Sequence, residues 1–149
     1  MRKLRLNRRN NTREFTNIVS SGSSITIPLS IFSDRTVAVL EILVEYLKDM
    51  HKLSYHEIAV LINRNDRTIW TAYNRAKKKR IKKSFSKNSK FHIPVKIFSD
   101  RSVSVFEILT EYCHDSLNLK FSQIARLTDR DDRTIWTVYR RTIKKRGKI

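Results

Sequence analysis

The side chains of this chain that could do chemistry are cations and hydrogen-bonding groups, and they occur twice at one spacing. Residues 66–71 read DRTIWT, and residues 132–137 repeat those six letters. Each copy precedes a basic run, at residues 77–80 and 144–146. Arginine, threonine and asparagine can hydrogen-bond to base edges, and lysine and arginine neutralise phosphates. The pattern therefore indicates nucleic-acid binding.

Catalytic and metal-binding patterns are weak by comparison. His51 and His56 have no cysteine close by in the sequence, which disfavours a zinc site. Cys113 aligns with Leu47 and is expected to be a small core residue. The acids that recur with the repeat are expected to cap helices rather than hold metals, and they are Asp34, Asp66, Asp100 and Asp132. We expect no enzyme, no metal and no cofactor.

Composition supports double-stranded DNA as the partner. The 149 residues include 32 Lys and Arg against 14 Asp and Glu, a formal net charge of +18. No run of about 18 apolar residues is present, so no membrane span is expected. Two glycines and two prolines are too few for an all-β fold, which favours helices. A single cysteine suits a reducing interior, so we expect a cytoplasmic, nucleoid-associated protein, or a nuclear one in a eukaryote.

An internal repeat organises the chain. Residues 27–80 align without a gap to residues 93–146, and 31 of the 54 aligned positions are identical. We expect a basic flexible arm at 1–24, a first module at 25–80, a basic linker at 81–90 and a second module at 91–149. A single domain built by internal duplication is the alternative. The arm also resembles an organellar transit peptide in composition.

Each repeat predicts one short extended segment followed by three helices. In the first repeat, residues 24–32 alternate in part and contain a proline, so the segment suits a sheet edge. Ser33 or Asp34 is expected to cap a helix that reaches about Met50 and is the longest element. A capping box at Ser54 predicts a short helix over residues 55–62. After a left-handed turn at residues 63–65, Asp66 is expected to cap the third helix.

These features predict a mainly α fold with two tandem three-helix helix-turn-helix modules, whose extended segments would pair as a β-ribbon. Ala59 and Ala125 are small residues placed where the second and third helices must cross closely. Ile69 and Ile135 have the spacing that packs the third helix onto the core. The opposite face of that helix is then available to a major groove.

Residues 53–69 resemble the promoter-reading helix-turn-helix of bacterial sigma factors and the DNA-binding domains of some transposases and resolvases. The resemblance covers roughly 30 residues per repeat and implies that the third helix contacts bases and phosphates. Together with the basic runs, it assigns DNA binding to Asn65, Arg67, Thr68, Trp70, Thr71, Asn74, Arg75, Lys77, Lys78, Lys79 and Arg80. In the second repeat it assigns the same role to Asp131, Arg133, Thr134, Trp136, Thr137, Arg140, Arg141, Lys144, Lys145 and Arg146.

Several assignments have a structural alternative. We expect Trp70 and Trp136 to pack on the extended segment or on the other repeat, because tryptophan favours buried contacts. Arg67 could form an ion pair with Glu57 instead of contacting a base. The basic runs could be a solvated face.

The second repeat departs from the first in ways that matter for DNA. Lys120 replaces the capping Ser54, and Thr128 stands where Ile62 should be buried. Acidic residues also gather before its third helix, at Asp129, Asp131 and Asp132. Because acids repel phosphates, we expect this repeat to bind DNA more weakly unless Arg140 and Arg141 compensate.

The resulting hypothesis is a sequence-specific transcription regulator that binds DNA through both modules. Paired extended segments would relate the modules by a pseudo-two-fold axis and favour an inverted-repeat site. An architectural nucleoid protein with little sequence preference is one alternative, and an adaptor that contacts the transcription machinery is another. A homodimer and a contact with RNA polymerase stay open. The basic arm, with Arg2, Lys3, Arg5, Arg8, Arg9 and Arg13, would enter a minor groove or attract phosphates nonspecifically.

Overall fold

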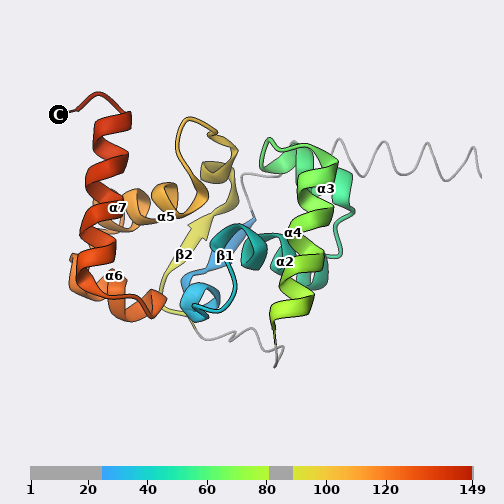
Figure 1. Cartoon of the computed structure of the whole chain (residues 1–149), viewed down its shortest axis with the longest axis horizontal. Helices are drawn as coiled ribbons and strands as arrows, with labels where there is room; N and C mark the ends of the chain where they lie inside the picture. The colour runs from blue at the N-terminus through green and yellow to red at the C-terminus, as the bar shows by residue number, and fades with distance from the viewer. Residues whose placement is uncertain (1–24, 81–88, 149) are drawn as a thin grey trace, which may run out of the picture.

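The computed structural model describes residues 25–80 and 89–148, and this part of the chain is mainly helical (Figure 1). The expected basic arm, most of the linker and Ile149 lie outside the described residues. The first repeat contains β1 (Thr26–Pro28), the 3-10 helix η2 (Leu29–Ser33), α2 (Val39–His51), α3 (Tyr55–Leu61) and α4 (Asp66–Lys79). The second repeat contains β2 (His92–Pro94), the 3-10 helix η3 (Val95–Ser99), α5 (Val105–Asp115), α6 (Phe121–Thr128) and α7 (Asp132–Lys145).

The two short strands form an antiparallel sheet, which confirms the expected ribbon. Ile27 lies opposite Ile93, its counterpart in the other repeat, so the pseudo-two-fold axis passes through this pair. The extended segment is shorter than expected, however. Pro28 and Pro94 end the strands, because proline has no N–H to donate to a ladder, and the following residues turn into η2 and η3.

The structure corrects two predictions about where helices begin. Neither Ser33 nor Asp34 caps α2; the helix starts after Ala38, whose N–H donates to Glu41. Asp34 instead accepts from the backbone and hydroxyl of Thr36.

The third helix of each repeat, α4 or α7, also begins one residue earlier than predicted; because these helices carry the predicted base contacts, they are called the reading helices below. Asn65 and Asp131 cap α4 and α7 by accepting from the N–H groups of the threonines three residues later, which puts Asp66 and Asp132 inside the first turn. An acid there still suits the positive end of the helix dipole. The capping box at Ser54 is present as predicted.

Helix lengths differ slightly from the prediction. At 13 residues, α2 is one residue shorter than α4 and α7, so it is not the longest element.

The left-handed turns are confirmed, since Asn63 has φ 57° and Asp129 has φ 53°. Ala59 and Ala125 are buried, as their predicted place between crossing helices requires.

Within each repeat the three helices pack on one another, and the 3-10 helices cross to the other repeat. η2 packs against α6, and η3 packs against α3. Phe32 of η2 and Phe98 of η3 are fully buried, with ring centroids 6.3 Å apart. Each helical triplet is therefore completed by a segment of the other repeat.

The buried apolar residues of both repeats belong to one cluster that includes Ile27, Ile93, Phe32 and Phe98. α2 also packs on α5 near the axis. In Figure 1, α4 and α7 lie at opposite ends of the long axis and run in opposite directions, as a two-fold arrangement requires. The division into two modules therefore describes the repeats, while the core is common to both.

A common core predicts one cooperative unfolding transition for both repeats. Each repeat contains one partly exposed tryptophan, so Trp70→Phe and Trp136→Phe leave a single fluorescent reporter in either half. We expect the two urea transitions to coincide. Ile93→Ala should lower the free energy of unfolding that either tryptophan reports by the same amount, about 2–5 kcal/mol, because it opens a cavity at the axis. Two separate transitions would contradict a common core.

Candidate nucleic-acid interface

The start of each reading helix is fixed by local backbone chemistry. A left-handed residue at position 63 or 129 ends the preceding helix, and a capping side chain starts the next one two residues later. Asparagine and aspartate tolerate the left-handed region better than most residues, which is why the turn needs no glycine. This tight connection sets the angle between the two helices of the motif.

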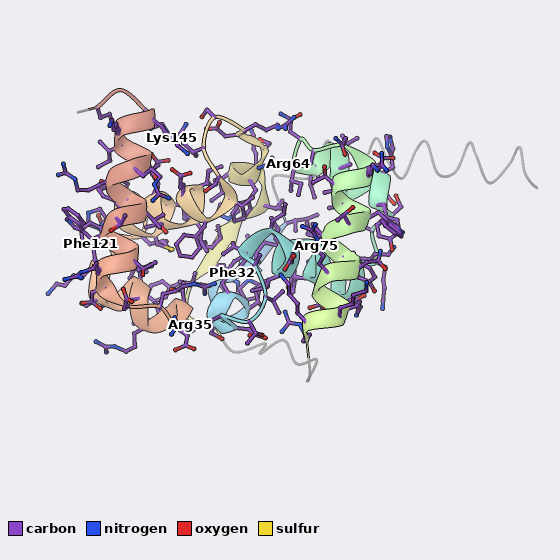
Figure 2. The ribbon with its side chains drawn as sticks, viewed as in Figure 1. Phe32, Arg35, Arg64, Arg75, Phe121 and Lys145 are labelled. Atoms are coloured by element: carbon purple, nitrogen blue, oxygen red, sulfur yellow. The ribbon has the colours of Figure 1, made fainter. Side chains whose placement is uncertain are left out.

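One face of α4 enters the core and the other reaches solvent. Ile69, Ala72 and Ala76 are buried. The exposed side chains on the opposite face are those of Asp66, Arg67, Trp70, Arg75, Lys77, Lys78 and Lys79. Thr71 and Asn74 share the helical face of Arg67 and Trp70 and are partly exposed, as is Thr68. The predicted outward face is thus present, and Figure 2 shows Arg75 on this helix.

The corresponding face of α7 is more exposed to solvent than that of α4. Ile135 and Thr142 are its buried residues. Its predicted site residues are exposed, namely Arg133, Thr134, Trp136, Thr137, Arg140, Arg141, Lys144 and Lys145. Arg140 replaces Asn74 of the first repeat and adds a cation to this face.

The tryptophans do not pack as predicted. Trp70 is 54% exposed and Trp136 is 49% exposed, so neither is buried by the extended segment or by the other repeat. The guanidinium of Arg140 lies 5.1 Å from the centre of the Trp136 ring, a cation–π contact at the surface. Both indoles are therefore available to an outside partner.

Two side chains of the first reading face are partly engaged with their own helix. The Thr68 hydroxyl donates to the Asn65 side chain at 2.8 Å, and the Asn74 amide donates to the Trp70 carbonyl at 2.8 Å. A shallow hollow of about 480 Å³ lies between α4 and the start of α2, with Arg67, Thr71 and Arg75 among its lining residues. Within the described residues, no ion pair joins Arg67 to Glu57. Arg67, Arg75 and Thr71 thus remain the strongest donors on this face.

The basic run after α4 requires a correction. Arg80 was assigned to DNA, but its side chain is only 6% exposed and forms an ion pair with the fully buried Glu45 at 2.6 Å. Lys79 pairs with Glu41 at 2.7 Å, and Lys77 pairs with Asp49 at 2.8 Å. These charges join the end of α4 to α2. Of this run, Lys78 has no acidic partner among the described residues and stays exposed.

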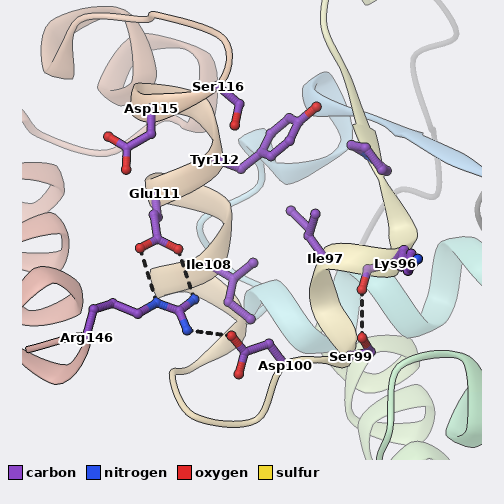
Figure 3. Close-up of a pocket in the computed structure, with 11 residues that line it drawn as sticks. Lys96, Ile97, Ser99, Asp100, Ile108, Glu111, Tyr112, Asp115, Ser116 and Arg146 are labelled. Carbon is purple, nitrogen blue, oxygen red and sulfur yellow. Dashed lines mark hydrogen bonds and ion pairs between the residues drawn. The ribbon is translucent and has the colours of Figure 1, made fainter.

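The second repeat has the same arrangement. Lys145, labelled in Figure 2, pairs with Glu107 at 2.7 Å. Arg146 donates to both Glu111 and Asp100 (Figure 3). Hydrogen bonds from the Ser102 hydroxyl and then from Arg146 lower the pKa of Asp100 to about 2. The carboxylates in turn raise the pKa of Arg146. Lys144 is the exposed cation that corresponds to Lys78.

Two arginines that join the repeats were missed by the sequence reasoning. Arg64 and Arg130 precede the capping residues, and each spans the two repeats. The Nη1 of Arg64 donates to the carbonyls of Ile62 and Phe98, and the Nη1 of Arg130 donates to those of Thr128 and Phe32. Their recurrence at one repeat position was the available signal. No sequence pattern, however, showed that their partners lie in the opposite repeat.

The remaining hollows and reactive groups do not form a second site of this kind. The hollow in Figure 3, about 530 Å³, is bordered by the Arg146 ion pairs. Cys113 is buried, as predicted, and burial raises the pKa of its thiol to about 12. Across residues 25–80 and 89–148, no group of three or more His, Cys, Asp and Glu side chains could hold a metal ion. No helix in those ranges is long and apolar enough to cross a membrane.

Neither a protein family, nor a curated protein, nor a solved structure matches this chain. The interface therefore stands on its geometry alone.

The corrected role of Arg80 predicts a stability effect. Arg80→Ala should cost about 3–5 kcal/mol of unfolding free energy, because it removes the partner at 2.6 Å from the buried Glu45 carboxylate and leaves only Lys77, at 3.7 Å, among the described residues. Lys78→Ala is the matched control, since it removes a neighbouring exposed cation and should change stability by less than about 0.5 kcal/mol. Urea denaturation measures both. Equal, small effects would show that the Arg80–Glu45 pair does not anchor α4.

Proposed function

We propose that this protein binds double-stranded DNA, with α4 and α7 each placed in a major groove. The observation that carries the proposal is the pair of exposed, arginine-bearing faces on equivalent helices of two helix-turn-helix motifs. Arg67 and Arg133 lie near the helix N-termini, where recognition helices contact base edges. Arginine pairs with guanine in a bidentate geometry, which suits these two residues to base reading.

The pairing of the repeats supports a further feature of the site. A common core holds α4 and α7 in a fixed orientation relative to each other, so the two helices would engage DNA together rather than independently. A pseudo-two-fold protein matches a pseudo-palindromic site. We propose a sequence-specific regulator that recognises an inverted repeat. Nucleoid association follows from DNA binding, while a homodimer and a contact with RNA polymerase remain predictions.

The first test measures binding of random-sequence duplex DNA over a range of salt concentrations. We expect the logarithm of affinity to fall against the logarithm of salt with a slope of about −6 to −10, because many phosphates are contacted. Fluorescence anisotropy with a labelled duplex gives the slope. A flat salt response, or no binding, would overturn the proposal and favour a protein partner.

The second test concerns base reading. Preferred sites are first selected from a random pool of duplexes. Arg67→Ala and Arg133→Ala should each weaken binding to the selected site by about 1–3 kcal/mol and relax the base specificity of one half-site. Lys96→Ala, which removes an exposed cation from η3, is the control and should act weakly on all sequences. If selection returns no motif, the protein is architectural rather than a sequence reader.

The third test concerns the geometry of the site. Duplexes carrying two half-sites as inverted or direct repeats, with their spacing varied in single base-pair steps, should separate the two arrangements. We expect the inverted repeat to bind best, at one spacing near a whole number of turns of about 10–10.5 base pairs. Indifference to orientation and spacing would contradict a fixed arrangement of the two reading helices.

A further inference from the structure

Two exposed arginines outside the reading helices occupy equivalent positions in the repeats. Arg35 and Arg101 directly follow Asp34 and Asp100, the residues that end η2 and η3. Sequence reasoning gave neither arginine a role. Both belong to loops whose 3-10 helix packs on the other repeat.

The crossing of the 3-10 helices brings each loop to the start of the opposite reading helix. Arg130, which directly precedes the cap of α7, donates to the Phe32 carbonyl of η2 at 2.8 Å. Arg64, which directly precedes the cap of α4, donates to the Phe98 carbonyl of η3 at 3.2 Å. In Figure 2, Arg35 lies where η2 meets α6.

Hydrogen bonds between the repeats bring the Arg101 loop beside Arg64, because Asn63 donates to the Ser99 carbonyl at 3.1 Å and Arg64 donates to the Phe98 carbonyl at 3.2 Å. Burial and then the charge of Arg101 lower the pKa of Arg64, while Asp100 raises it. Burial and then the charge of Arg35 lower the pKa of Arg130, while Asp129 and Asp34 raise it. Each reading helix thus begins beside two arginines, one from each repeat. Like charges held together repel, and a phosphate between or beside them relieves that repulsion.

We propose that Arg101 contacts a backbone phosphate beside the half-site read by α4, and that Arg35 does so beside the half-site read by α7. Each DNA-binding surface is then composite, since its reading helix and one phosphate contact come from different repeats. This inference rests on the proposed DNA binding. It goes beyond it by naming two contact residues and the repeat that each one serves.

The two surfaces are not equally strong. Hydrogen bonds from Thr134 lower the pKa of Asp131, the cap of α7, and the charge of Arg35 contributes to the same shift. The equivalent cap of α4 is the neutral Asn65. Part of the Arg35 charge is therefore offset within the protein, so Arg101 should make the larger contribution to binding.

The experiment uses the full chain and random-sequence duplex DNA. Arg101→Ala should reduce the salt slope by about 0.9 and weaken binding about tenfold at 50 mM salt, as expected for one lost phosphate contact. Arg101→Lys should restore most of the slope, whereas Lys96→Ala should change affinity less than about twofold. The melting temperature without DNA should not fall in Arg101→Ala, because removing Arg101 relieves repulsion with Arg64.

A double-variant cycle tests which surface Arg101 serves. In a background with Arg67→Ala and Arg75→Ala, which disables the α4 surface, Arg101→Ala should cause little further loss. In a background with Arg133→Ala and Arg141→Ala, which disables the α7 surface, it should cause its full loss. Arg35→Ala should cause little further loss in the background that disables the α7 surface and its full loss in the background that disables the α4 surface. That full loss should be smaller than the one caused by Arg101→Ala.

The outcomes separate this inference from the proposed function. If the unmodified protein does not bind DNA, the proposed function fails. If it binds and Arg101→Ala behaves like Lys96→Ala, or couples to α7 rather than α4, the composite surface is wrong. A fall in the melting temperature with an unchanged salt slope would assign Arg101 a structural role instead.

Discussion

The antiparallel pairing of Ile27 with Ile93 is the constraint on which the rest of this structure depends. The prolines that follow end the ribbon after three residues and direct both chains into 3-10 turns. Because the strands run in opposite directions, each turn is carried past the axis to the helices of the other repeat. Phe32 and Phe98 then meet in the middle of the common core. A repeat by itself would lack both its pairing strand and the turn that covers its helices.

The reading helices are anchored at both ends by interactions that use much of the apparent positive charge. At the N-terminal end, Arg64 and Arg130 bond to carbonyls of the opposite repeat. At the C-terminal end, Arg80 reaches the buried carboxylate of Glu45. A buried charge is tolerated only when it is paired, so these cations belong to the fold. Arg67, Lys78, Arg133 and Lys144 on α4 and α7 stay exposed instead.

Differences between the repeats make the outer faces of α4 and α7 chemically unlike. The first repeat has neutral Asn63 and Asn65 around its turn, where the second has Asp129 and Asp131. Asn63 also donates to the Ser99 carbonyl across the interface, which a carboxylate cannot do. The second repeat gains Arg140, whose guanidinium lies over Trp136. A negative charge near the N-terminus of α7 and an added cation further along it would shift phosphate contacts toward the middle of that helix.

The sequence by itself determined the local elements. The 66-residue offset of the repeat, the capping box at Ser54, the left-handed turn at Asn63 and the apolar spacing of the third helix were all readable, because each depends on neighbours within about one turn of helix. Exact caps were less secure, since Asn65 and Asp66 are both good capping residues and only the backbone shows which one precedes the first turn. Only the tertiary structure decided that the 3-10 helices cross between repeats, that Arg80 is buried and that the tryptophans are exposed. These outcomes depend on which surfaces pack together in the fold, and the packed residues are far apart in the sequence. An arginine at a helix end looks the same in the sequence whether a buried glutamate or solvent lies beside it.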